Sequence, residues 1–251
     1  MEAIYEKLLW LSHELGKEER GLAILGEGNT SVQLDAETFA VKASGCTLAT
    51  LSKDTIAVCE FESLLDLLDN EDMSDHDVDQ ALMDARIDSS MKKPSVEAMF
   101  HASLLSLPEI SFVGHTHPIT VNQLLCGGWA QSFADQRLFP DQIVCCGDRS
   151  LVIPYTDPGF VLAKEVHVRV RAFIDEFGQP PVTIVIENHG LIALGKTEKQ
   201  VLSATLMAEK SAKIFTGALQ CGKKGPVFLS REQVQRIAGR PDEHYRQKML
   251  S

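Results

Sequence analysis

The sequence predicts an α/β fold built as a single domain over residues 1–251. Two observations favour it. Segments with apolar residues at helical spacing alternate along the chain with short apolar segments typical of strands. No linker-like stretch and no internal repeat interrupts this alternation. The length allows one sizeable core or two small ones, and the uninterrupted alternation favours one. The end of the chain, residues 238–251, is predicted to be a polar tail.

The first half of the chain begins with a predicted helix over residues 2–16. Ile4, Leu8, Leu11 and Leu15 recur there at helical spacing. Further along we expect a turn at residues 26–29, strands at 38–45 and 54–60, a helix at 61–70 and an acidic surface loop at 70–80.

A strong helix is predicted over residues 92–108. Pro94 lies near its start, Glu97 in its first turn, and apolar residues recur through Leu105. The elements expected after it are strands at 110–117, 142–147 and 150–155, helices at 118–128, 158–178 and 197–220, and a pair of apolar strands at 181–195 around a turn at Asn188-His189-Gly190.

Composition excludes several classes of protein. The formal net charge is -11 and no run of Lys or Arg occurs, so nucleic-acid binding is not expected. No stretch approaches the ~18 apolar residues of a membrane span, and the acidic N-terminus does not resemble a signal peptide. We therefore expect a cytoplasmic protein that does not bind membranes, with its six cysteines reduced.

Two histidines occupy alternate positions of an apolar strand, His115 and His117 in ISFVGHTH. Side chains at alternate strand positions point to the same face, so both imidazoles can converge on one ion while Thr116 faces away. His189 follows at the turn between two apolar strands. Three neutral imidazoles plus an open position are typical of a catalytic zinc site or that of a similar ion. The alternative is three separate structural histidines, and the spacing favours the metal.

Glu97 and His101 leave two interpretations open. A carboxylate in a first helical turn interacts favourably with the helix dipole and can cap the helix, so Glu97 is either a cap or a site residue. His101 lies one turn further along and either orients Glu97 or packs in the core.

Two turns, GEGNTS and KASGC, combine glycine with small hydroxyl or amide side chains. Glycine allows close approach of the backbone to a ligand, so such turns can bind a phosphate or a sugar hydroxyl. Plain turns share the same composition, and GEGNTS is not the dinucleotide-binding pattern GxGxxG.

Taken together and in order, these motifs resemble the class II aldolase and adducin family, over about residues 5–220. The motifs are Gly28-Asn29-Thr30-Ser31, Ser44-Gly45, Pro94-Ser95-Val96-Glu97, His115-Thr116-His117 and Asn188-His189-Gly190. The resemblance implies an α/β/α domain with a central, mostly antiparallel sheet. Segments such as PSVEAMFHASLL are most similar to the aldolase domain of bifunctional rhamnulose-phosphate aldolase/dehydrogenase proteins.

The resemblance also implies roles for these residues. The three histidines would bind a divalent metal, usually zinc, and Glu97 would be both a metal ligand at rest and a catalytic acid or base. The substrate phosphate would be bound by the turn residues Gly28, Asn29, Ser44, Gly45 and Ser95. Val96 departs from the family, which often has a second serine there, and one hydroxyl is thereby lost.

The implied reaction is metal-dependent cleavage of a ketose 1-phosphate, or a related ketose, to dihydroxyacetone phosphate and an aldehyde through an enediolate. Sugar-phosphate 4-epimerases and methylthioribulose-phosphate dehydratases use the same kind of site, and an adducin-like scaffold without catalysis is a fourth possibility. Family members commonly form tetramers with active sites at subunit interfaces. A homotetramer is therefore expected, in which His244 or Tyr245 of the C-terminal tail reaches a neighbouring site as the second catalytic acid.

Overall fold

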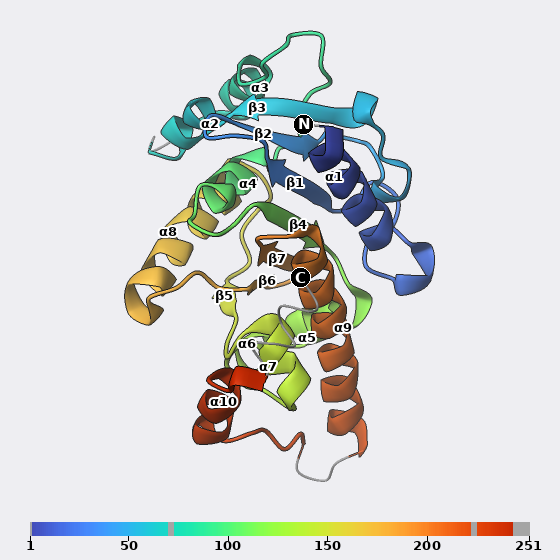
Figure 1. The fold of residues 1–251 in the computed structure, drawn as a ribbon, viewed down its shortest axis with the longest axis vertical. Helices are drawn as coiled ribbons and strands as arrows, with labels where there is room; N and C mark the ends of the chain where they lie inside the picture. Colours follow the sequence, from blue (N-terminus) through green and yellow to red (C-terminus); the bar gives the residue numbers. More distant parts are fainter. Residues whose placement is uncertain (1, 70–72, 222–224, 243–251) are drawn as a thin grey trace.

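All strands in the described part of the protein form one sheet. The computed structural model describes residues 2–69, 73–221 and 225–242 (Figure 1). The strand order is β3-β2-β1-β4-β7-β6-β5. The strands are β1 (Asn29–Gln33), β2 (Thr38–Lys42), β3 (Ile56–Glu60), β4 (Phe112–Thr116), β5 (Leu151–Ile153), β6 (Thr183–Ile186) and β7 (Gly190–Gly195). Only the β5–β6 pair is parallel, so the expected mostly antiparallel sheet is confirmed.

Ten α-helices accompany the sheet within the described residues. They are α1 (Glu2–Leu15), α2 (Phe61–Leu68), α3 (Asp75–Asp84), α4 (Ala98–Leu105), α5 (Ile119–Cys126), α6 (Ala130–Asp135), α7 (Pro140–Cys146), α8 (Phe160–Phe177), α9 (Glu198–Cys221) and α10 (Arg231–Ala238). Three short 3-10 helices cover Glu18–Arg20, Leu48–Thr50 and Lys53–Thr55.

Helices cover both faces of the sheet and give the expected α/β/α layers. On β2, Phe39 and Val41 enter the core under α2, α4 and α8, while Ala40 between them enters the core under α1 and α9. This alternation follows from the two-residue period of a strand and explains why β2 is apolar on both faces. Figure 1 shows α4 and α8 on one side of the sheet and α1 and α9 on the other.

Several elements differ from the sequence prediction. The helix expected over residues 92–108 spans only Ala98–Leu105, and β1, α6 and α10 were not predicted. Residues 142–147 were expected to form a strand, but the segment lies in helix α7, which begins at Pro140, ends at Cys146 and packs against α9. A short apolar run does not distinguish strand from helix, whereas proline at the first helical position is a start signal. The expected acidic loop at 70–80 is helical from Asp75, because Ser74 and Asp77 form a capping box. Val78 and Leu82 of that helix are buried in the core.

The centre of the sheet brings two distant segments together. Strand β4 lies between β1 and β7, with His115 opposite Asn29 on one side and opposite Ile192 on the other. The end of β4 therefore lies beside the turn that joins β6 to β7, which contains His189. This pairing places the predicted metal ligands at the C-terminal end of the central strand β4.

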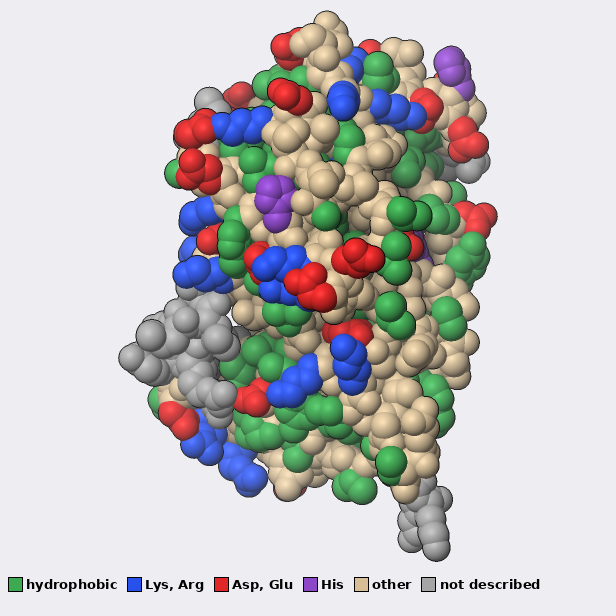
Figure 2. Space-filling model, turned by 90° about the vertical axis from the view of Figure 1, so that its right-hand side faces the viewer, with side chains coloured by type: hydrophobic (Ala, Val, Ile, Leu, Met, Phe, Trp, Pro, Cys, Tyr) green, Lys and Arg blue, Asp and Glu red, His purple; other side chains and the backbone are tan. Residues whose placement is uncertain are grey.

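The surface agrees with the composition. On the face drawn in Figure 2, Lys and Arg side chains are interspersed with Asp and Glu and form no continuous basic surface. None of the described helices is long and apolar enough to cross a membrane. All six cysteines are free thiols, with Cys59 and Cys146 buried and Cys126 and Cys221 exposed.

Candidate metal centre

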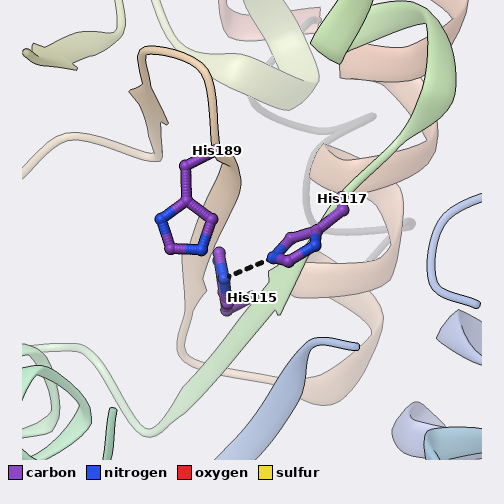
Figure 3. A group of neighbouring side chains, drawn as sticks. All are labelled: His115, His117 and His189. Atoms are coloured by element: carbon purple, nitrogen blue, oxygen red, sulfur yellow. Dashed lines mark hydrogen bonds between the residues drawn. The ribbon is translucent and has the colours of Figure 1, made fainter. Parts of the chain in front are cut away.

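Three histidine side chains converge at the end of β4. His115 lies in β4, His117 follows its last residue, and His189 lies in the turn between β6 and β7. The three ring centroids are 4.8 to 5.0 Å apart. One ligand nitrogen from each ring lies within 4.8 Å of the other two. Figure 3 shows the rings pointing toward one another, so the convergence expected from the HxH spacing is present.

The turn that carries His189 depends on its two neighbours. Asn188 has a φ of 53°, in the left-handed region that asparagine tolerates better than most residues. A Cβ on Gly190 would lie 2.6 Å from the carbonyl oxygen of Thr116 and 2.8 Å from the His117 ring. Glycine therefore allows this turn to pack directly against the end of β4, which is what brings the three rings together.

Hydrogen bonds orient the rings and leave ligand nitrogens available. Nδ1 of His115 donates to the carbonyl of Leu191 at 3.1 Å, so its Nε2 carries the free lone pair. That Nε2 lies 3.0 Å from Nε2 of His117. On the other side of the His117 ring, Nδ1 is 3.9 Å from Oε1 of Glu27.

Side chains from helices α5 and α9 fix the backbone next to these rings. The Asn122 side-chain amide donates to the backbone carbonyl of His189 at 2.9 Å. The buried carboxylate of Glu209, from α9, accepts the backbone N–H groups of Thr120 and Val121 and the Thr120 hydroxyl. A carboxylate at a helix N-terminus satisfies otherwise unpaired N–H groups, and here it fixes the segment that directly follows His117.

Burial keeps the three imidazoles neutral. Burial, together with the charge repulsion of the neighbouring imidazoles, lowers the pKa of His115 to about 3 and that of His117 to about 4. Burial also lowers the pKa of His189, although the Glu97 carboxylate opposes that shift. All three nitrogens therefore offer lone pairs at neutral pH. Three neutral imidazoles facing one point are a donor set that suits zinc or a similar divalent ion.

Glu97 belongs to the same cluster. It is the N-cap residue of α4 rather than part of its first turn, and its side chain makes no capping hydrogen bond. Its Oε1 lies 3.6 Å from Nε2 of His115 and 3.5 Å from Nε2 of His189. The Glu97 side chain therefore does not cap the helix, and its carboxylate faces the histidine cluster.

Behind Glu97 lies a chain of hydrogen bonds. The Asn29 amide donates from Nδ2 to Oε2 of Glu97 and, at 3.2 Å, to the Ser95 hydroxyl. The Asn29 Oδ1 contacts Nε2 of His101, whose Nδ1 lies 2.6 Å from the Ser31 hydroxyl. The His101 ring is thus linked to the Glu97 carboxylate through Asn29 and is hydrogen bonded at both nitrogens, while its backbone N–H donates to the Glu97 carbonyl at 3.2 Å.

The turn residues predicted to bind phosphate lie next to these hydrogen-bonded side chains. Ala43 and Pro94 form an isolated antiparallel bridge, which places Ser44 opposite Lys93 and Ser95 opposite Lys42. The backbone N–H of Ser44 donates to the carbonyl of Lys93, and the backbone N–H of Ser95 donates to the carbonyl of Lys42. Neither backbone amide is therefore free for an anion. A Cβ built on Gly45 would meet no atom within 4 Å, and Gly45 therefore borders open space.

Gly28 has a different role from Gly45. It has a φ of 66°, and a Cβ there would lie 2.5 Å from the carbonyl oxygen of His115. The turn before β1 thus packs closely on the strand that carries His115, which only glycine permits.

The sequence reasoning missed Lys42. This side chain is buried, and its ammonium donates to the carbonyl of Cys46 at 2.6 Å and lies 3.5 Å from those of Gly26 and Ala43. It therefore ties the two glycine-containing turns together. The signal was present in the chain, because a lysine ending the apolar strand TFAVK is unusual for a fully buried position.

Comparison with known proteins agrees with the geometry. The model of the "Class II Aldolase and Adducin N-terminal domain" matches residues 6–216. The chain belongs to the class II aldolase and adducin family. The class II aldolases of this family are lyases or related enzymes and use a divalent metal.

Individual relatives of this class II aldolase family member are distant. The chain is 27% identical over 219 residues to the uncharacterized oxidoreductase YuxG of Bacillus subtilis, covering 84% of this chain but only 29% of that protein. It is also 27% identical to the 3-oxo-tetronate 4-phosphate decarboxylase of Haemophilus influenzae, covering 80% of this chain and 83% of that protein. A solved L-fuculose 1-phosphate aldolase shares its fold, with a TM-score of 0.71, 18% identity and 95% of each chain covered.

Two of the family-derived site residues lie outside the described part of the chain. These are His244 and Tyr245, in the C-terminal tail. Val96, where many family members have serine, lies between Ser95 and Glu97, and its side chain is 3.7 Å from the position of a Cβ on Gly159. It packs against the core of α2, α4 and α8 as a partly buried residue.

Proposed function

We propose that this protein is a metal-dependent aldolase that cleaves a ketose 1-phosphate, or a related ketose, into dihydroxyacetone phosphate and an aldehyde. The observation that carries the proposal is the position of Glu97. Its Oε1 lies within 3.6 Å of Nε2 of both His115 and His189. A carboxylate beside three neutral imidazoles joins a metal-binding donor set to a group that can move protons.

His115, His117 and His189 would hold the ion, with Glu97 as a further ligand before substrate binds. Zinc is proposed because three imidazoles and one carboxylate match its preferred ligands. When bound, the ion would supply a Lewis acid that stabilises negative charge on the carbonyl and neighbouring hydroxyl oxygens of the substrate.

Glu97 would move the proton that the reaction requires. Cleavage breaks the bond between the carbon next to the substrate's carbonyl and the following carbon, which carries a hydroxyl. The electron pair of that bond moves toward the carbonyl. The hydroxyl must first lose its proton, because its oxygen becomes the aldehyde oxygen. The carbon next to the carbonyl must then receive a proton. The Glu97 carboxylate would take up the proton that the hydroxyl releases, directly or through the second acid proposed from the tail, and deliver it to that carbon, so no proton is gained or lost overall.

The substrate phosphate would lie against the two glycine-containing turns. Support comes from the hydrogen bond between Asn29 and Ser95 and from the open space beside Gly45. The side chains of Ser44 and Ser95, together with the backbone at Gly28 and Gly45, would form this subsite beside Asn29, whose amide is already paired with Glu97, Ser95 and His101. Since the amides of Ser44 and Ser95 are already paired, side-chain groups would provide most of its contacts.

Other reactions use the same chemistry. A 4-epimerase or a dehydratase acting on a sugar phosphate needs the same ion and the same proton-moving carboxylate. A decarboxylase acting on a 3-oxo acid phosphate is a second candidate, favoured by the relative from Haemophilus influenzae, of which this chain covers 83%. A scaffold has no need for three converging imidazoles, one of them fully buried, with a carboxylate beside them.

The deciding experiment is product analysis with zinc-loaded protein. The panel contains ketose 1-phosphates, their unphosphorylated ketoses, a ketose 5-phosphate, a methylthioribulose phosphate and a 3-oxo-tetronate 4-phosphate. Release of dihydroxyacetone phosphate, lost in Glu97→Gln, supports the proposal. Carbon dioxide release, epimerisation or loss of water as the main reaction would replace aldol cleavage. No reaction with any of them would favour the scaffold.

The family also motivates a proposal about assembly. We propose a cytoplasmic homotetramer in which the tail with His244 and Tyr245 completes a neighbouring subunit's site. Light scattering on the purified protein tests the first part, because a monomer at micromolar concentration would contradict it.

A further inference from the structure

His101 is a polar residue in an otherwise apolar part of helix α4. It has no exposed surface, and its ring stacks on Phe100 with centroids 4.8 Å apart. A buried histidine that served only for packing would need partners for its nitrogens but no particular ones. The partners here are specific, because Ser31 is bound at Nδ1 and Asn29 at Nε2.

The hydrogen bonds assign the protons shared by the side chains of Glu97, Asn29, His101 and Ser31. The Glu97 carboxylate accepts, so Asn29 faces it with its Nδ2 donor group. The Oδ1 of Asn29 must then face His101, and an amide oxygen can only accept. Nε2 of His101 therefore carries the hydrogen, and Nδ1 accepts the hydroxyl hydrogen of Ser31. Burial lowers the pKa of His101 well below its usual range, so the ring is neutral.

We propose that His101 is a positioning residue, which fixes the side-chain amide of Asn29 so that Asn29 holds the Glu97 carboxylate facing the three metal-binding histidines. The part that concerns turnover rests on the proposed function. Asn29 could otherwise rotate its amide by half a turn and present Oδ1 to the carboxylate, which would repel it. A donor at Nε2 of His101 disfavours that rotated state, since two donors would then face each other.

The sheet explains why this arrangement is rigid. Asn29 lies directly opposite His115 in the pairing of β1 with β4, so its backbone is fixed relative to a metal ligand. Ser31 is two residues further along β1, on the same face as Asn29, and it contacts the other nitrogen of His101. The strand thus holds both ends of the imidazole, and only the Asn29 amide is left to be oriented.

Two substitutions at His101 separate positioning from packing. His101→Leu fills the space but donates nothing, whereas His101→Gln retains a side-chain donor that can reach Oδ1 of Asn29. Positioning predicts that His101→Leu lowers kcat by about 10-fold to 100-fold, with KM within about twofold and zinc content unchanged. His101→Gln should recover most of the lost kcat, even if it is the less stable of the two. A packing role predicts the reverse order, with His101→Leu at least as active as His101→Gln, and that result would overturn the proposal.

A double substitution and a spectroscopic test complete the design. Once Asn29→Ala has removed the amide, adding His101→Leu should lower kcat by less than about twofold; a full additional loss would contradict the proposal. Nitrogen-15 NMR of histidine-labelled, zinc-loaded protein should find His101 protonated at Nε2 and unprotonated at Nδ1 from pH 6 to 8. The opposite tautomer would overturn the assignment. If the wild-type protein processes no substrate of the panel, the proposed function fails, but the NMR measurement still decides the His101 arrangement.

Discussion

Oε1 of Glu97 lies 3.5 Å from Nε2 of His189, although the two residues are far apart in the sequence. Neither residue is in a regular element. Glu97 precedes helix α4, and His189 lies in the turn between β6 and β7. Their contact places a carboxylate beside an imidazole of the candidate metal centre, and four of the predictions below concern this cluster.

Loss of one imidazole should release the metal. His115→Ala or His117→Ala removes one of three converging ligand nitrogens, so we expect the zinc-to-protein ratio to fall from near one to near zero and activity to disappear. Elemental analysis after dialysis measures the ratio, and circular dichroism checks that the fold is kept. His76→Ala is the control, because His76 is exposed on α3. Unchanged metal content in both site variants would exclude this centre.

Glu97→Gln should separate catalysis from stability. Glutamine keeps the shape but cannot take up a proton, so turnover should fall by about 100-fold or more while metal is retained at least in part. The free energy of unfolding should change little, because Glu97 makes no capping hydrogen bond. Glu60→Gln is the control at another N-cap without such a bond, on exposed surface before α2. Near-normal turnover in Glu97→Gln would refute a proton-moving role.

Gly190→Ala should damage both the fold and the centre. The added methyl group would lie 2.6 Å from the Thr116 carbonyl oxygen and 2.8 Å from the His117 ring, so either the turn or the ring must move. We expect a loss of about 1–3 kcal/mol in the free energy of unfolding and weaker zinc binding in a competition titration. Gly217→Ala in α9 is the control, since a Cβ there meets no atom within 4 Å. Equal zinc affinity in the two variants would argue against a role for this close approach.

The metal-free protein should lose stability as the pH falls from 7 to 5. Burial lowers the folded-state pKa of His115 from its ordinary 6.5 to about 3. Between these values the unfolded chain binds a proton that the folded protein does not, so acidification favours unfolding. In urea titrations, His115→Gln should lose less stability below pH 6.5 than the wild type, by up to about 1.4 kcal/mol per pH unit. Parallel pH profiles for the two proteins would contradict this assignment.

Removal of the C-terminal tail tests the proposed contribution of a neighbouring subunit. A chain truncated after Arg240 lacks His244 and Tyr245, so turnover should fall sharply while zinc content and oligomeric state are retained. The control is a full-length His244→Ala/Tyr245→Phe double variant, which should lose as much activity as the truncation. Full activity of the truncated protein would remove both residues from the mechanism.

The sequence by itself determined the elements whose signals are local. The HxH motif placed two imidazoles on one face because strand side chains alternate, and the apolar pattern predicted the long helices α8 and α9 and the strand pair β6–β7. The order of the motifs was sufficient to identify the family, which the matching family model confirmed. Where an apolar run was short, as in α7, the apolar pattern did not distinguish helix from strand; the helix begins at the Pro140 start signal and packs against α9.

The tertiary structure alone decided what Glu97 and His101 contact. A glutamate after Pro94 is compatible with a helix cap, and a histidine on an apolar helix is compatible with simple packing. Their roles depend on partners from β1, β4 and the β6–β7 turn, which are distant in the chain and meet only when the sheet forms. Hydrogen bonds and Coulomb interactions act over a few ångströms, so neither role is encoded in the residues adjacent in sequence.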